Sequence, residues 1–258
     1  MKKLLCIMIA MVMCLGLLAG CDGTTTPVDP NAPVGGNTNE GGNPEIGTMF
    51  EIALTAPFTG FDPLRTNDSA STYVNAQIYE TLYRINPVTG EYDPLLAAEL
   101  PEFSEDGMTV TVKLREGVKW VDMNGNIKGD VTAHDWAVAL EWVMNFYKND
   151  SSHTSQPIEM IAGAKEYYEY TKGLTQEEAY ALDASEGSVF MEMVGIECPD
   201  DLTLVYTCPT EKPYFPSFPA WAGLYPMPQA MVDELGVDGV KSMDNTNYWY
   251  NGCYTMTE

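Results

Sequence analysis

The chain has few of the residues and motifs on which most enzymes depend. It contains two histidines and no H-E-x-x-H, G-x-S-x-G or G-x-x-x-x-G-K-[ST] motif. No Cys-x-x-Cys pair suggests zinc or redox chemistry. His134 falls in the first turn of a predicted helix and His153 in a polar loop, so we expect two solvated side chains. The sequence therefore predicts a non-enzymatic protein without a metal or other cofactor.

Basic residues are also scarce. The 258 residues include 13 Lys and Arg against 37 Asp and Glu, a formal net charge of −24. Such a charge repels phosphate backbones, which makes nucleic acid an unfavourable partner. We interpret the acidity as a means of solubility rather than as an acidic binding patch. After the N-terminal segment no run of 18 apolar residues occurs, so we expect no further membrane span.

The N-terminus has the pattern of an export signal. Lys2 and Lys3 precede residues 4–18, which carry no charge and are too few to span a bilayer, which takes about 20. Leu18-Ala19-Gly20-Cys21 resembles the bacterial lipobox, in which the cysteine is acylated and becomes the mature N-terminus. Residues 1–20 are therefore predicted to be a lipoprotein signal peptide. The alternative is an ordinary signal peptide with an unmodified Cys21.

Residues 21–48 are predicted to be a flexible linker, because Gly, Asn, Thr and Pro dominate and no apolar periodicity occurs. A chain of this length reaches about 28 Å. It suits a tether between a lipid anchor and a folded domain. We therefore expect an exported protein, anchored by lipid to the extracytoplasmic face of the cell membrane.

Three cysteines remain beyond the anchor, and an odd number cannot pair completely. Cys198 and Cys208 flank a predicted hairpin that turns at residues 199–201. This arrangement separates them by about 20 Å, whereas a disulfide needs Cα atoms within about 7 Å. Together with Cys253 they are predicted to be buried thiols.

Strands and helices are mixed along the rest of the chain, which predicts an α/β or α+β domain. Apolar alternation marks strands at residues 49–55, 108–118, 189–197 and 202–207; in the second of these Val110, Val112 and Leu114 form the buried face. Helical spacing places Tyr73, Ala76, Tyr79, Leu82 and Tyr83 on one helix capped by Asp68 or Ser69.

Further helices are predicted from their caps. Thr132 and Asp135 have the spacing of a capping box, ahead of an apolar face of Trp136, Leu140, Val143 and Tyr147. A second helix covers residues 158–170 and ends before Gly173, a third starts at the box Thr175–Glu178, and a last short helix ends near Gly236.

A Pro-rich segment holds the aromatic residues Tyr214, Phe215, Phe218, Trp221 and Tyr225. Aromatic side chains on loops offer rigid contact area for peptides or sugars. The simpler interpretation, which we favour, is that they fill the core.

Several stretches together resemble the extracytoplasmic solute-binding proteins of peptide, dipeptide and nickel ABC importers, family 5. They are FDPLRTNDSASTYVNAQIYETLYRINP, PLLAAELPEFSEDGMTVTVKLREGVKW, VTAHDWAVALEWVMN, VGIECPDDLTLVYTCPTEKPYFPSF and NGCYTMTE. The second carries the signature pattern of the family: Ala98, Asp106, Leu114-Arg115 and Gly117-Val118. The resemblance extends from about residue 50 to residue 258.

This resemblance implies an α/β fold like that of the type II periplasmic binding proteins, which are two-lobed clamps. Residues 49–71 and 189–258 would belong to the first lobe, and residues 72–188 to an extra subdomain packed on it. Members of the family are normally about twice this length, so we expect the second lobe to be missing. The chain would then be a fragment, a truncated product, or one half of a clamp completed elsewhere.

The resemblance also implies a function and a site. The protein would capture peptides, with oligopeptides favoured over dipeptides, nickel chelates, haem or sugars, and deliver them to an ABC permease and its ATPase. The loop after the first strand would bind the ligand through Ala56, Pro57, Phe58, Thr59 and Phe61, although Pro57 has no N–H to donate. Tyr214, Phe215 and Trp221 would line the edge of the cleft. Two alternatives stay open: a lipid-anchored hydrolase of peptides or glycans, and a surface adhesion protein.

Overall fold

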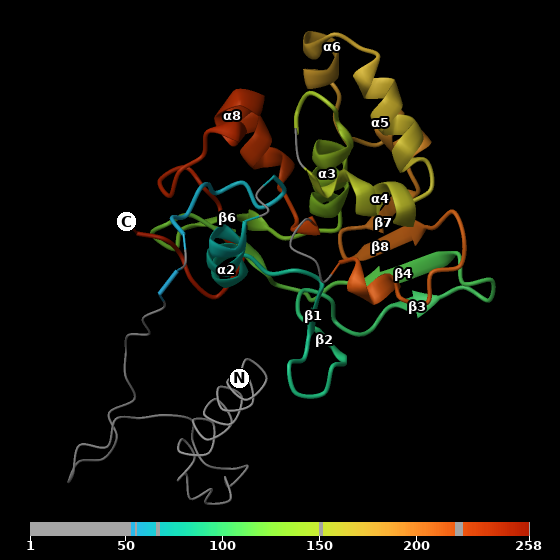
Figure 1. Ribbon diagram of the computed structural model, residues 1–258, viewed down its shortest axis with the longest axis horizontal. Coiled ribbons are helices and arrows are strands. Elements are labelled where there is room, and N and C mark those ends of the chain that lie inside the picture. Colours follow the sequence, from blue (N-terminus) through green and yellow to red (C-terminus); the bar gives the residue numbers. More distant parts are fainter. Residues whose placement is uncertain (1–52, 55, 66–67, 150–151, 220–223, 258) are drawn as a thin grey trace, which may run out of the picture. The chain divides into compact units, whose positions relative to one another are not determined.

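The computed structural model describes residues 53–54, 56–65, 68–149, 152–219 and 224–257, within one compact unit. Its α-helices are α2 (Ser69–Ile78), α3 (His134–Met144), α4 (Ser155–Met160), α5 (Ala164–Lys172), α6 (Gln176–Tyr180), α7 (Val189–Met193) and α8 (Gln229–Lys241) (Figure 1). Its strands are β1 (Tyr83–Ile85), β2 (Tyr92–Pro94), β3 (Glu102–Phe103), β4 (Thr109–Lys113), β5 (Lys119–Val121), β6 (Ile127–Asp130), β7 (Ile196–Asp200) and β8 (Thr203–Thr207). No helix in these described ranges is long and apolar enough to cross a bilayer. The predicted signal peptide, the linker with Cys21 and most of the predicted strand 49–55 lie outside them.

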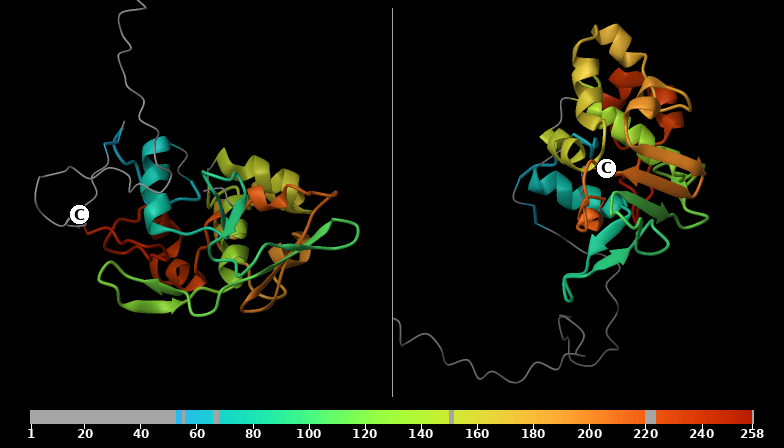
Figure 2. Two further views of the ribbon diagram at one scale, coloured as in Figure 1. Left: turned by 90° about the horizontal axis from the view of Figure 1, so that it is seen from below. Right: turned by 90° about the vertical axis from the view of Figure 1, so that its right-hand side faces the viewer.

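The largest sheet is antiparallel, with strand order β3-β4-β8-β7. Val110 and Val112 of β4 face Tyr206 and Leu204 of β8, and all four side chains are buried. The alternation that predicted β4 is therefore confirmed, because its two valines supply one face of the sheet to the core. The pairs β1–β2 and β5–β6 form separate hairpins. The β1–β2 hairpin extends away from the helices in Figure 1 and in the right-hand view of Figure 2.

The same sheet joins two segments that the resemblance assigned to different parts. Strands β3 and β4 come from the predicted subdomain, whereas β7 and β8 come from the predicted first lobe. The boundary near residue 188 therefore does not separate two sheets. The division into a lobe and a subdomain stays a prediction.

Helix α3 forms where predicted, but its start and its surroundings differ. Ala133, not Thr132, precedes the helix and makes no side-chain capping bond. One bond of the predicted box is nevertheless present, because Asp135 accepts the backbone N–H of Thr132 (3.0 Å). The same carboxylate also accepts Nε1–H of Trp120 (2.8 Å). The helix is buried on all sides from residue 135 to 144, and Tyr147 lies beyond its end. A single apolar face was thus the wrong expectation for a helix enclosed by other elements.

Two helices replace the single one predicted for residues 158–170. Between α4 and α5 the backbone of Ala162 pairs with that of Thr207 (2.9 Å) and of Gly195 (2.8 Å). Gly163 then turns the chain with a φ of 75°. The predicted stop at Gly173 and the capping box Thr175–Glu178 are confirmed. The break arises from long-range pairing, which local helical spacing does not encode.

Helix α2 is capped by Asp68, as predicted, since its carboxylate accepts the N–H of Ser71 at 2.9 Å. It ends earlier than expected, and Tyr83 belongs to β1. Its buried face also differs, because Tyr73 is 64% exposed while the polar Ser71 and Asn75 are buried. This helix therefore turns polar side chains inward.

Other local predictions are corrected in the C-terminal half. Residues 189–193 form α7 rather than part of a strand, although the hairpin β7–β8 is confirmed. The predicted end of a helix near Gly236 is confirmed, because Gly236 has non-helical dihedrals (φ 69°, ψ 169°), and a second helical segment then completes α8 to Lys241. All three thiols are free: Cys208 is buried, Cys198 half-buried and Cys253 exposed. Burial was thus the wrong prediction for Cys253.

Gly163 offers a test of the break between α4 and α5. A Cβ at this position would lie 1.7 Å from the backbone oxygen of Met193, whereas a Cβ at Gly187, with a similar φ of 77°, would meet nothing within 4 Å. We expect Gly163→Ala to lower the unfolding free energy by about 3 kcal/mol or more in denaturant titrations. Gly187→Ala should cost only about 1 kcal/mol, the price of the positive φ. Equal losses of unfolding free energy in the two variants would contradict the close approach of Gly163 to the backbone of Met193.

Asp135 makes stability depend on pH. Burial raises the pKa of its carboxyl from 3.8 to about 6. The folded state therefore binds this proton more tightly than the unfolded state, so this group's contribution to stability falls as the pH rises from about 4 to 6. Asp135→Asn keeps an acceptor for the N–H groups of Trp120 and Thr132 but removes the titration. Denaturant titrations from pH 4 to 7 should show a flatter decline in the variant, and an unchanged decline would contradict the assignment.

Candidate ligand-binding site

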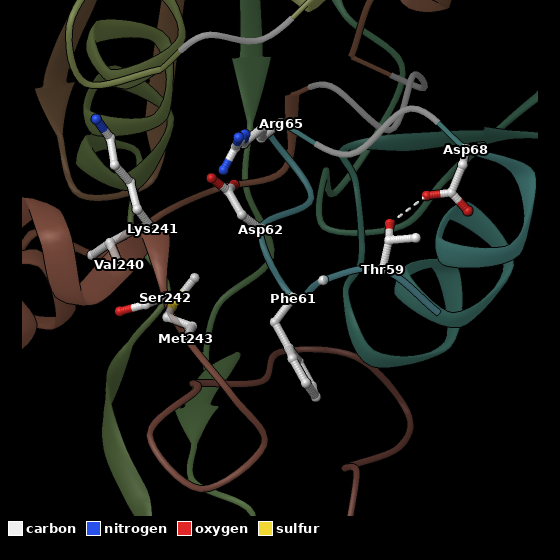
Figure 3. Close-up of a pocket in the computed structure, with 10 residues that line it drawn as sticks. Thr59, Phe61, Asp62, Arg65, Asp68, Val240, Lys241, Ser242 and Met243 are labelled. Carbon is white, nitrogen blue, oxygen red and sulfur yellow. Dashed lines mark hydrogen bonds between the residues drawn. The ribbon is translucent and has the colours of Figure 1, made fainter. Parts of the chain in front are cut away.

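A cavity of about 510 Å³ lies between the loop that precedes α2 and the segment at the end of α8 (Figure 3). Its volume is in the range of pockets that hold small ligands. The first wall consists of Thr59, Gly60, Phe61, Asp62, Arg65 and Asp68, and the second of Val240, Lys241, Ser242 and Met243. Two of the predicted ligand-binding residues, Thr59 and Phe61, therefore line it.

Hydrogen bonds fasten the first wall to the start of α2. The Thr59 hydroxyl donates to Oδ2 of Asp68 at 2.7 Å, and the Thr59 N–H donates to Oγ of Ser71 at 3.0 Å. Ser71 in turn donates its N–H to Oδ1 of Asp68. Because the carboxylate that caps the helix also holds the loop, the loop and α2 are positioned together.

The first wall carries charge of both signs. The N–H of Ser71, and after it the Thr59 hydroxyl, lower the pKa of the Asp68 carboxyl, so this group stays ionised at neutral pH. Asp62 is buried and accepts the N–H of Leu64 at 3.0 Å. In Figure 3 the side chains of Asp62 and Arg65 point toward one another. The wall therefore carries two carboxylates and one guanidinium group.

Aromatic contacts fix the other end of the loop. Phe58 packs edge-on against Phe61 with ring centroids 4.9 Å apart, and Phe61 lies 5.4 Å from the buried ring of Tyr248. Tyr248 also contacts Tyr79, just beyond α2, at 4.9 Å. Such pairs add to the stability gained by burial. The loop is thus held from behind by the C-terminal segment.

The structure does not bring all the predicted site residues together. Ala56 and Pro57 are exposed and do not line the cavity, while Phe58 does not line it either but packs against the lining residue Phe61. Tyr214 is 48% exposed and donates to Glu159, away from the cavity.

Phe215 is completely buried between Tyr206 and Phe218, so the ligand contact predicted for it is replaced by a core position. Phe218 and Tyr225 of the same Pro-rich segment are buried as well. The prediction that the aromatic residues fill the core is therefore confirmed for Phe215, Phe218 and Tyr225. Trp221 lies outside the described residues.

Several lining residues were not predicted. Asp62, Arg65 and Asp68 directly follow the predicted loop, so extending the loop into α2 would have found them. Residues 240–243 carry no sequence signal, because only the fold places them opposite the loop.

A second hollow of about 550 Å³ lies beside the end of α2 and contains none of the predicted ligand-binding residues. It is lined by Thr72, Ala76, Gln77, Tyr79, Glu80, Thr81, Arg84, Leu95, Tyr225, Cys253 and Tyr254. The first cavity is therefore the better candidate.

Comparison with known proteins identifies the family. Residues 91–258 match the sequence model of the bacterial extracellular solute-binding proteins, family 5, middle region. The chain belongs to this family. The resemblance inferred from the sequence is thereby confirmed.

Individual family 5 proteins are similar over most of this chain. The oligopeptide-binding protein OppA of Bacillus subtilis (strain 168) is 30% identical over 224 residues, which cover 86% of this chain and 36% of the relative. The oligopeptide-binding protein AmiA of Streptococcus pneumoniae serotype 4 is 24% identical over 245 residues, which cover 95% of this chain and 32% of the relative.

Solved structures confirm the fold class. Haemophilus influenzae OppA in complex with the peptide RPPGFSPFR matches with a TM-score of 0.58 and 26% identity, over 77% of this chain and 33% of that chain. The pheromone receptor PrgZ matches with a TM-score of 0.64 and 24% identity, over 80% of this chain and 35% of that chain. The chain therefore has part of a type II periplasmic-binding-protein fold and spans about a third of the length of these relatives.

Thr59 provides a test of how the first wall is held. Thr59→Val removes the hydroxyl that donates to Asp68, so we expect the pKa of the Asp68 carboxyl to rise and the loop to exchange its amide hydrogens faster. Thr59→Ser, the matched control, retains the donor and should leave both unchanged. NMR titration of the carboxyl and hydrogen exchange measure the two effects. Equal behaviour of Val and Ser would show that the hydroxyl does not hold the loop.

Proposed function

We propose that this chain is the peptide-capturing part of a substrate-binding lipoprotein of an ABC importer. It holds oligopeptides outside the membrane and passes them to a permease and its ATPase. The observation that carries the proposal is the cavity whose wall contains Thr59 and Phe61, in a chain whose relatives are oligopeptide-binding proteins. Within it, residues 49–71 and 189–258 would contribute to the first lobe and residues 72–188 to the subdomain.

The loop suits an extended peptide because its backbone is held before any ligand arrives. Thr59 is bonded to the start of α2 and Phe61 is packed on Tyr248, so little loop entropy is lost on binding. A peptide can align its main chain with such a loop as an added strand does. Asp68 and Arg65 line the same wall and supply partners for the charged groups of a peptide.

Capture near the membrane would depend on Cys21, the proposed lipidation site, and on the linker of residues 21–48. Two or more acyl chains hold a protein stably at a bilayer. The intact mass of the protein from membrane fractions tests this step, and a mass without acyl groups would overturn it.

Peptide capture is tested by binding without turnover. We expect one oligopeptide per chain to bind, to raise the melting temperature, and to be recovered intact by mass spectrometry. Ser242→Trp enlarges a residue that lines the second wall and should weaken binding about ten-fold or more. Thr210→Trp, on an exposed residue outside the cavity, is the matched control and should bind as the unaltered chain does.

Cleaved peptide would favour the hydrolase, and a melting temperature insensitive to a peptide library would contradict peptide capture. Equal binding by the two tryptophan variants would place the peptide elsewhere.

A further inference from the structure

Both walls of the cavity are attached to the same short segment, residues 145–149, which follows α3. On the first wall, Nδ2 of Asn149 donates to the backbone oxygen of Leu64 at 3.3 Å, and Leu64 lies between the lining residues Asp62 and Arg65. On the second wall, Nζ of Lys241 donates to the backbone oxygen of Tyr147 at 2.7 Å. The two attachment points are two residues apart in the chain.

Buried polar contacts hold this segment rigidly. Asn145 is completely buried, and its Oδ1 accepts the N–H groups of Tyr147 and Lys148 at 3.2 Å each. Its Nδ2 donates to Oε1 of Glu141 at 2.9 Å, while Nζ of Lys148 donates to Oε2 of Glu141 at 2.7 Å. Both charged side chains are at most 5% exposed. Displacing the segment would leave a buried charge without its partner, so its position is strongly constrained.

Lys241 has a second contact that fixes its direction. Its Nζ donates to the hydroxyl of Tyr180 in α6 at 2.8 Å and lies 5.0 Å from the centre of that ring. Figure 3 shows its amino group directed away from Asp62 and Arg65. The ammonium group is therefore directed toward the helices rather than toward a ligand, and it ties the end of α8, beyond the kink at Gly236, to them.

We infer that residues 145–149 set the separation of the two cavity walls, with Asn149 and Lys241 as positioning residues for the ligand. The inference rests on the proposed function, because it concerns the same cavity. Each anchor holds its own wall: Asn149 the turn at residues 62–65, and Lys241 residues 240–243. Losing one anchor frees one wall and leaves the other in place.

Hydrogen exchange measured by mass spectrometry tests the anchoring directly, because both walls contain hydrogen-bonded amides such as those of Arg65 and Met243. Lys241→Met should speed exchange in residues 240–243 and leave residues 62–65 unchanged. Asn149→Ala should speed exchange in residues 62–65 and leave residues 240–243 unchanged. Lys165→Met, which removes the same charge from the exposed face of α5, is the control and should change neither. Faster exchange throughout the chain, or in neither wall, would overturn the inference.

Peptide affinity tests the consequence for binding. Lys241→Met and Asn149→Ala should each weaken binding about ten-fold, and Lys241→Arg, which keeps a cationic donor, should recover most of the loss. Unaltered affinity in both variants of a chain that binds peptide would overturn the inference. If the unaltered chain binds no peptide while the exchange pattern is as expected, the proposed function fails and the anchoring of the walls stands.

Discussion

The buried ion pair between Glu141 and Lys148 is the contact on which the arrangement around the cavity depends. Glu141 also accepts hydrogen bonds from Asn145 and from the hydroxyl of Tyr167 (2.8 Å), so one carboxylate joins α3, α5 and the segment after α3. Burying two charges gains little stability compared with an apolar pair of the same volume. Each of these hydrogen bonds nevertheless requires its partners to lie in a defined position, which fixes the segment relative to α3 and α5.

Further hydrogen bonds connect this network to the cavity walls. Asn145 also donates to the backbone oxygen of Ala179 in α6, and α6 supplies Tyr180 as a partner of Lys241. Helices α3, α5 and α6 thus form the scaffold, whereas the cavity walls are irregular segments that rest on it. A ligand site made of loops on a rigid support can adapt its contacts without disturbing the core.

Helix α2 also supports a cavity wall, through polar side chains on its inner face. Ser71 and Asn75 are buried, and Ser71 bonds to the loop at Thr59 rather than packing in an apolar core. The aromatic contacts from Phe61 through Tyr248 to Tyr79 then connect the loop to the end of the same helix. These contacts hold the loop at two points, at Thr59 and at Phe61.

The sequence by itself determined the features that depend on neighbours along the chain. The alternation of Val110 and Val112 predicted β4, the Asp68 cap and the Thr175–Glu178 box predicted helix starts, and the family motifs predicted the fold class and the loop at Thr59. The caps and the strand alternation are local signals, because they are properties of a few adjacent residues, whereas the family motifs are spread from about residue 50 to residue 258.

Only the tertiary structure decided the rest. The break at Gly163 follows from pairing with Thr207 and Gly195, and the full burial of α3 follows from the elements that surround it. Phe215 became a core residue because Tyr206 and Phe218 enclose it. Residues 240–243 became a cavity wall because Lys241 reaches Tyr147, which is 94 positions away in the chain. Contacts between such distant residues form only when the chain is folded, and no spacing in the sequence predicts them.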